Sequence, residues 1–155
     1  LFGIPSTGFR FFTVYGPWGR PDMALFKFTD AILKGDAIDV YGEGRMQRDF
    51  THVSDIVAGI LGALAHSSTE PVPHRVFNLG NHAPVELERF IEVIEQAAAR
   101  PARKVYKPMQ AGDMVRTMAD TRRAHDAFGY SPSLPIEQGL PPVVAWCRDY
   151  FGESG

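Results

Sequence analysis

Few residues of this sequence have a type and spacing that predict chemistry by themselves. Cys147 is the one cysteine and no two of the five histidines lie four residues apart, so neither a disulfide nor a zinc-binding helix is expected. The Gly42-Glu43-Gly44 turn lacks the third glycine of a dinucleotide-binding fingerprint, because Gln47 stands at that position. Neither a Gly-Lys-Ser/Thr phosphate loop nor a Gly-x-Ser-x-Gly nucleophile elbow occurs. Generic motifs therefore indicate no more than an α/β domain.

The elements that must position any site alternate between strand and helix. Apolar runs predict strands over residues 9–15, 38–41, 48–53, 76–79 and 104–106. Apolar residues at helical spacing predict helices over residues 25–32, 56–64, 84–98, 121–128 and 136–147. Gly35 and Gly129 are expected to end two helices, Ser54 or Asp55 to cap the second helix, and Pro84 to open the third. This order predicts an α/β fold with parallel strand pairs.

Length and composition exclude several classes of protein. The chain has 155 residues, 45% hydrophobic and 22% charged, which is enough to bury a core and rules out disorder. Its net charge of -2 gives no bulk attraction to nucleic acid or to an anionic membrane. No apolar run approaches the roughly 18 residues of a membrane-spanning helix, and a single cysteine suits a reducing compartment. We expect a cytoplasmic protein without a nucleic-acid or membrane partner.

Five segments, in order, resemble the nucleotide-sugar epimerases of the extended short-chain dehydrogenase/reductase family. Residues 10–24 read Arg-Phe-Phe-Thr-Val-Tyr-Gly-Pro-Trp-Gly-Arg-Pro-Asp-Met-Ala, and residues 48–55 read Arg-Asp-Phe-Thr-His-Val-Ser-Asp. The others are Phe-Asn-Leu-Gly-Asn at 77–81, Gly-Asp-Met-Val-Arg-Thr-Met-Ala-Asp at 112–120 and Ile-Glu-Gln-Gly-Leu at 136–140. The first segment resembles UDP-glucuronate 4-epimerases more closely than UDP-galactose 4-epimerases, because the latter have asparagine at the position of Thr13.

The resemblance implies the C-terminal strands of a Rossmann-type parallel sheet together with a small α/β nucleotide-sugar-binding domain. Residues 1–16 and 75–82 would supply the Rossmann strands, and residues 17–66 and 83–155 the substrate-binding part. The family also needs a glycine-rich turn for NAD and a Ser/Thr with Tyr-x-x-x-Lys for catalysis. The residues four positions after the five tyrosines are Gly19, Arg45, Gln110, Leu134 and Ser154. The NAD-binding half with its catalytic residues is therefore expected upstream of Leu1, and no catalytic residue in this chain.

The resemblance assigns residues of the first segment to the cofactor and the sugar. Phe11 and Phe12 match positions beside the nicotinamide of NAD, and both are also expected to be buried strand side chains. Thr13 matches a position facing the sugar or its diphosphate, where its hydroxyl can hydrogen-bond a carboxylate. Arg20 matches a position near the sugar, where a guanidinium can hold a carboxylate or phosphate through two hydrogen bonds. A plain strand threonine and a surface arginine are the alternatives.

The diphosphate would be held by a helix start and an arginine. Ala24 and Leu25 match a helix N-terminus whose backbone N–H groups approach the diphosphate, as anions commonly bind there. Lys27 would add charge, or remain a solvated helix lysine. Arg48 matches the diphosphate arginine of the family, with a structural salt bridge as its alternative.

The nucleoside would be read by a strand and a turn. Asp39, Val40 and Tyr41 match the strand that reads uracil through main-chain hydrogen bonds, with Tyr41 packing on the base. Asp113 matches a carboxylate that accepts from the ribose hydroxyls, a turn aspartate being the alternative. Arg116 is a weaker neighbour of the same site.

These assignments imply part of an NAD-dependent epimerase that inverts C4 of a UDP-sugar, most closely UDP-glucuronate, through a 4-keto intermediate. The alternatives are a dehydratase, decarboxylase or other 4-epimerase of the family, a stand-alone UDP-sugar-binding or regulatory module, and an inert fragment. The longer parent is expected to be a homodimer through helices upstream of this chain. We expect this chain to bind NAD little by itself, and to self-associate through an open sheet edge.

Overall fold

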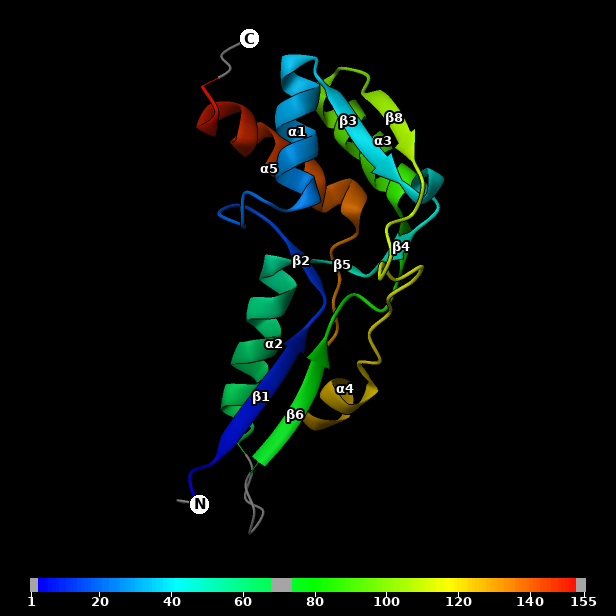
Figure 1. Ribbon diagram of the computed structural model, residues 1–155. Helices are drawn as coiled ribbons and strands as arrows, with labels where there is room; N and C mark the ends of the chain where they lie inside the picture. The colour runs from blue at the N-terminus through cyan, green and yellow to red at the C-terminus, as the bar shows by residue number, and fades with distance from the viewer. Residues whose placement is uncertain (1–2, 68–73, 153–155) are drawn as a thin grey trace.

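The computed structural model describes residues 3–67 and 74–152, which form two packed groups of elements (Figure 1). One group holds the parallel strands β1 (Ser6–Phe11) and β6 (His74–Leu79) with helices α2 (Val53–Ala65) and α4 (Arg122–Phe128). The other holds the parallel strands β3 (Ala37–Tyr41) and β8 (Arg103–Lys107) with α1 (Ala24–Lys34), α3 (Leu87–Ala98) and α5 (Ile136–Tyr150). The expected α/β order with parallel pairs is confirmed.

Two short strand pairs join these groups. Strand β2 (Thr13–Tyr15) pairs in parallel with β5 (Phe50–His52). Strand β4 (Gln47–Arg48), which follows the short 3-10 turn η1 (Gly42–Gly44), pairs antiparallel with β7 (Val85–Glu86). Helix α2, which the expected division assigns to the substrate-binding part, packs against α4 and shares a buried cluster with β6. None of the described helices is long and apolar enough to cross a membrane.

The main core lies between α1, α3 and α5. The helical face of α3 supplies Phe90, Ile91 and Ile94, all fully buried. The Phe90 ring stacks on that of Phe50, with centroids 3.9 Å apart. A smaller cluster, which includes Ile38 and Val40, lies under β3. Strand β3 is therefore fixed from one side by its own alternating apolar residues.

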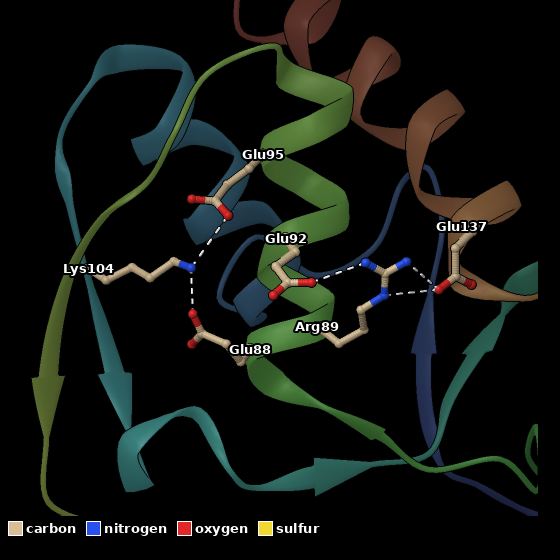
Figure 2. A network of polar contacts seen from close by, with 6 residues as sticks. All are labelled: Glu88, Arg89, Glu92, Glu95, Lys104 and Glu137. Carbon is tan, nitrogen blue, oxygen red and sulfur yellow. Dashed lines mark hydrogen bonds and ion pairs between the residues drawn. The ribbon is translucent and has the colours of Figure 1, made fainter.

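Polar contacts hold α3 to its neighbours on two sides (Figure 2). The Lys104 ammonium on β8 lies 2.6 Å from Glu88 and 3.4 Å from Glu95, both on α3. Burial lowers the pKa of Lys104, but its hydrogen bond with Glu88 and the charge of Glu95 outweigh that effect, so its pKa is raised overall. Arg89 pairs with Glu137 of α5 at 3.1 Å. The network fixes β8, and through it β3, on the helical layer.

The apolar run over residues 9–15 is not one buried strand, as the sequence predicted. The chain changes partner at Phe12, whose N–H donates to the Leu79 carbonyl, whereas the Thr13 N–H donates to the Asp49 carbonyl. The predicted burial of Phe11 is also wrong, because its side chain is 50% exposed. The run over 48–53 likewise divides, into β4 and β5.

Helix ends follow the predictions in part. Gly35 and Gly129 end α1 and α4 in the left-handed conformation, with φ of 80° and 71°. Pro84 does not open α3, because residues 85–86 pair with β4 and delay the helix to Leu87. Helix α2 is capped by His52, and not by Ser54 or Asp55: the imidazole accepts from the Ser54 N–H at 3.2 Å.

This cap makes stability depend on pH. Burial lowers the pKa of His52, although the nearby Asp55 opposes the shift. The stabilisation by neutral imidazole is therefore complete above its ordinary pKa and is lost as the pH falls below it, when the ring becomes a cation at a helix N-terminus. We expect the free energy of unfolding to fall by about 0.5–1 kcal/mol through this group between pH 7.5 and 5. His52→Asn keeps a cap without the titration, so urea unfolding should show a shallower pH slope. An equal slope in both proteins would contradict this assignment.

An open edge and apolar side chains predict association between copies of this chain. Among the described residues, β6 is the one strand that pairs with β1. Phe11 on β1 and Leu61 and Leu64 on α2 are exposed. Light scattering at high concentration should therefore report species larger than a monomer, and replacing Leu61 and Leu64 by glutamate should reduce them. A wild-type chain that stays monomeric at every concentration would contradict the expectation.

Candidate functional site

A pocket of about 440 Å³ lies between α1 and β3 and is called here the α1–β3 pocket. Its lining residues are Asp22, Ala24, Lys27, Phe28, Ala31, Ala37, Ile38, Asp39 and Tyr41. Four of these are residues that the resemblance assigned to a nucleoside diphosphate: Ala24 and Lys27 to its diphosphate, and Asp39 and Tyr41 to its uracil base. The pocket thus brings together a helix start and a strand that are more than ten residues apart in sequence.

The N-terminus of α1 gives one end of this pocket a positive character. No side chain caps the helix at Met23, and its first turn contains no acidic residue. The backbone N–H groups at Ala24 and Leu25 therefore have no side-chain cap and no carboxylate within the first turn, while Asp22, just before the cap, is paired with Arg20. Lys27 adds a cation to the same wall. Leu25 itself is buried in the main core, so only its main chain is available to a ligand.

Strand β3 forms one wall of the pocket, and the main-chain groups along its unpaired edge are free to bind a ligand. Among the described residues, β8 is the one strand hydrogen-bonded to β3, so the opposite edge keeps unpaired N–H and C=O groups. Val40 is fully buried, whereas Asp39 and Tyr41 line the pocket. Asp39 pairs with Lys107 at 2.6 Å, and this hydrogen bond raises the pKa of Lys107. A planar heterocycle whose edge carries hydrogen-bond donors and acceptors can bind to these unpaired main-chain groups.

A second hollow of about 570 Å³ lies beside the ends of β1 and β6, and is called here the β1–β6 pocket. Its lining residues are Arg10, Phe11, Phe12, Thr13, Asn78 and Thr117. Phe11, Phe12 and Thr13 are thus brought together, and Phe11 stacks on Phe9 with centroids 6.1 Å apart. Sequence reasoning missed Arg10, Asn78 and Thr117. Arg10 and Asn78 lie side by side at the carboxyl ends of β1 and β6, a register that only the structure reveals.

Arg48 lies on β4 and lines neither pocket. Its guanidinium donates to the carbonyls of Met114 at 2.5 Å and Gln47 at 3.0 Å, and lies 3.8 Å from the Met46 sulfur. None of these partners is a carboxylate, so its charge is not neutralised by an ion pair within the part of the chain described. No structural salt bridge holds Arg48 among the described residues, and the side chain is partly buried with its charge available to an anion.

The remaining predicted residues lie on loops. Arg20 is exposed and pairs with Asp22, a lining residue of the α1–β3 pocket, at 3.2 Å. Asp113 lies in a turn in which its N–H donates to the Gln110 carbonyl. Arg116 is exposed and pairs by its backbone with Gln47, next to Arg48. The structure places these residues near one pocket or beside Arg48, but in the lining of neither pocket.

A buried carboxylate, Asp49, orders the segments around the β1–β6 pocket. It is fully buried and accepts from the backbone N–H groups of Asn81 at 2.6 Å, His82 at 3.1 Å and Ala119 at 2.7 Å. Its own N–H donates to the Thr117 hydroxyl. Asp49 therefore ties β5 to the loop after β6 and to the segment that carries Thr117. Nothing in the residue pattern distinguishes it from the other residues of its motif.

The residues present fit only a small part of an NAD molecule. The exposed Phe11 ring and the neighbouring Phe12 would suit the face of a nicotinamide. The sequence contains no Gly-x-Gly-x-x-Gly turn, and no tyrosine is followed by lysine four positions later. No catalytic step therefore follows from these residues. Within the described residues, no group of three or more His, Cys, Asp or Glu side chains could hold a metal ion.

Comparison with known sequences gives close relatives. Residues 1–80 match the family described as the NAD dependent epimerase/dehydratase family. The chain is 46% identical over 162 residues to a probable UDP-glucuronate 4-epimerase of Rhizobium meliloti (strain 1021), covering 94% of the chain and 47% of that protein. It is 41% identical over 165 residues to UDP-glucuronate 4-epimerase 1 of Arabidopsis thaliana, covering 98% of the chain and 38% of that protein. The chain spans about half the length, or less, of the curated relatives it matches.

Solved structures agree with these relatives. The UDP-glucuronic acid 4-epimerase from Bacillus cereus, crystallised with UDP-glucuronic acid and NAD, superposes with a TM-score of 0.87 at 29% identity. That match covers 96% of this chain and 47% of the crystallised one. MoeE5 in complex with UDP-glucuronic acid and NAD superposes with a TM-score of 0.85 at 30% identity, covering 93% and 47%. The expected Rossmann-type α/β fold is thereby confirmed.

Proposed function

The chain belongs to the NAD-dependent epimerase/dehydratase family, and we propose that it forms the UDP-sugar-binding part of a UDP-glucuronate 4-epimerase. The observation that carries this proposal is the α1–β3 pocket, in which an uncapped helix start and Lys27 face the free edge of β3. A helix start with a cation suits a diphosphate, and a free strand edge suits the edge of a base.

Each part of the site then has a physical task. The N–H groups of Ala24 and Leu25, with Lys27, hold the diphosphate, and the β3 main chain from Asp39 to Tyr41 hydrogen-bonds the uracil. Arg48 adds a charge-assisted contact to a diphosphate oxygen. This distant binding energy anchors the nucleotide while the sugar remains free to turn.

The sugar and ribose contacts come from the loops and the second pocket. Thr13 and Arg20 bind the sugar carboxylate, and Phe11 and Phe12 lie beside the nicotinamide of NAD held by the family's other half. Asp113 accepts from the ribose hydroxyls, with Arg116 as a neighbour. NAD supplies the hydride acceptor in the family's chemistry. The 155-residue chain alone is expected to be inactive, because it lacks the tyrosine–lysine pair.

Calorimetric titration of this chain tests the proposal. UDP should bind, inorganic diphosphate should bind more weakly because it cannot use the β3 edge, and NAD alone should release little heat. UDP-glucuronate should compete with UDP better than UDP-glucose if Thr13 and Arg20 hold the carboxylate. Equal competition would favour another 4-epimerase of the family. Absence of any response to UDP would leave the inert-fragment alternative.

A further inference from the structure

The loop over residues 16–23, called here the Trp18 loop, carries a tryptophan in an unfavourable setting. Trp18 has a φ of 62°, a left-handed conformation that costs a bulky residue free energy. Its side chain is 78% exposed, so burial of apolar surface compensates little. A strained and exposed aromatic residue requires another explanation than core packing.

The ring contacts of Trp18 supply that explanation. Its indole lies edge-to-face against Trp146 at 5.2 Å and against Tyr150 at 5.9 Å, between ring centroids. Both partners are on α5, where their own rings stack at 4.9 Å. The indole therefore docks the Trp18 loop onto the last two turns of a helix that belongs to the main core.

The same loop forms one wall of the α1–β3 pocket. Asp22 lines that pocket, and α1 begins two residues later at Ala24, which also lines it. Between the Trp18 indole and Asp22, the loop packs directly against α1 at Gly19. A Cβ atom at this position would lie only 2.6 Å from the ring of Phe26 on α1, so no larger residue fits there. The backbone path from the docked indole to the pocket wall is thus short and tightly packed.

We propose that Trp18 is a positioning residue, whose docking on Trp146 and Tyr150 holds Asp22 and the start of α1 in the geometry that binds a nucleoside diphosphate. The proposal rests on the function proposed above and assigns a determinant outside the pocket. Each edge-to-face pair stabilises the docked loop modestly. When the pairs are lost, the fraction of molecules with a formed pocket falls, and the apparent dissociation constant rises in proportion.

Docking can be observed without ligand, because Trp18 and Trp146 are the only two tryptophans of the chain. Two indoles at this separation couple their transitions and give a paired positive and negative circular dichroism signal in the far ultraviolet. Trp18→Ala and Trp146→Phe should each abolish this signal. Amide hydrogen exchange at Met23, whose N–H donates to the Arg20 carbonyl, should become faster in Trp18→Ala.

Calorimetry with UDP provides the functional test. We expect Trp18→Ala to weaken UDP binding about tenfold, and Tyr150→Ala to weaken it less because one ring contact remains. Trp18→Phe should restore affinity to within about threefold, since it keeps an edge-to-face ring. Leu64→Ala removes a similarly exposed apolar side chain on α2 and serves as the matched control.

The outcomes separate the two proposals. Wild-type affinity in Trp18→Ala, with the paired signal gone, would overturn the positioning role while leaving the UDP site intact. An equal loss in Trp18→Ala and Trp18→Phe would also contradict it, because the ring contacts would then be irrelevant. Failure of the wild-type chain to bind UDP would instead overturn the proposed function and this inference with it.

Discussion

Arg48→Ala is expected to weaken UDP binding by about 2–4 kcal/mol, or roughly 30-fold to 1,000-fold in dissociation constant. The guanidinium of Arg48 is held by main-chain carbonyls and lacks a carboxylate partner among the described residues. A diphosphate oxygen would therefore be its first anionic partner. Calorimetric titration of the wild-type chain and the variant with UDP measures the effect directly.

Two further variants make the Arg48 result specific. Arg48→Lys keeps the charge but not the planar fork, so its affinity should lie between those of the wild type and Arg48→Ala. The guanidinium of Arg148 also donates a hydrogen bond to a main-chain carbonyl, that of Ala98. Neither residue lines the α1–β3 or the β1–β6 pocket. Arg148→Ala should therefore bind UDP as the wild type does. Unchanged affinity in Arg48→Ala would remove this arginine from the site.

The second large effect is on stability and concerns Asp49. Asp49→Ala leaves three backbone N–H groups without their acceptor in a fully buried position. We expect the free energy of unfolding to fall by about 3–5 kcal/mol, measured by urea denaturation. Asp49→Asn keeps the shape and one acceptor oxygen, and should lose less.

A surface carboxylate gives the comparison for Asp49. Asp126 is exposed and contacts His125 at 3.3 Å, so Asp126→Ala should change stability by less than about 0.5 kcal/mol. A similarly small effect in Asp49→Ala would mean that the three N–H groups find water or other acceptors. The role of Asp49 in ordering the β1–β6 pocket would then be wrong.

Local chemistry made part of the fold predictable. The helices over α1, α3 and α4 follow from apolar residues at helical spacing, and Gly35 and Gly129 end two of them because only a left-handed residue closes those turns well. Strand β8 was predictable as an element, but its pairing with β3 was not. That pairing joins residues more than sixty positions apart and depends on the packing of α3 between them.

The errors share a physical cause, which is competition from long-range contacts. The run over 9–15 has the composition of one strand, yet Phe12 and Thr13 bond to different partners and divide it. Pro84 is a suitable first helical residue, but pairing of 85–86 with β4 takes precedence. His52 caps α2 although serine and aspartate follow it, because β5 ends at His52 and the helix starts immediately after.

The candidate site was predictable mainly through resemblance. Generic motifs indicated nothing at Lys27 or Tyr41, because a nucleotide pocket made of main chain and one helix start leaves little trace in residue types. The structure buries Val40 completely, which leaves the β3 backbone as the part able to bind. The role of Trp18 was not predictable from sequence, because its partners on α5 lie more than 120 residues away along the chain.

The most direct test of the central claim is to map UDP onto the chain by the chemical shifts of its backbone amides. We predict that titration with UDP shifts the amides at 24–27 and 37–41 most, since these carry the helix start and the free strand edge of the α1–β3 pocket. Largest shifts instead at 81–82 and 121–132, which line a different hollow of about 410 Å³, would contradict the claim, as would no shifts at all.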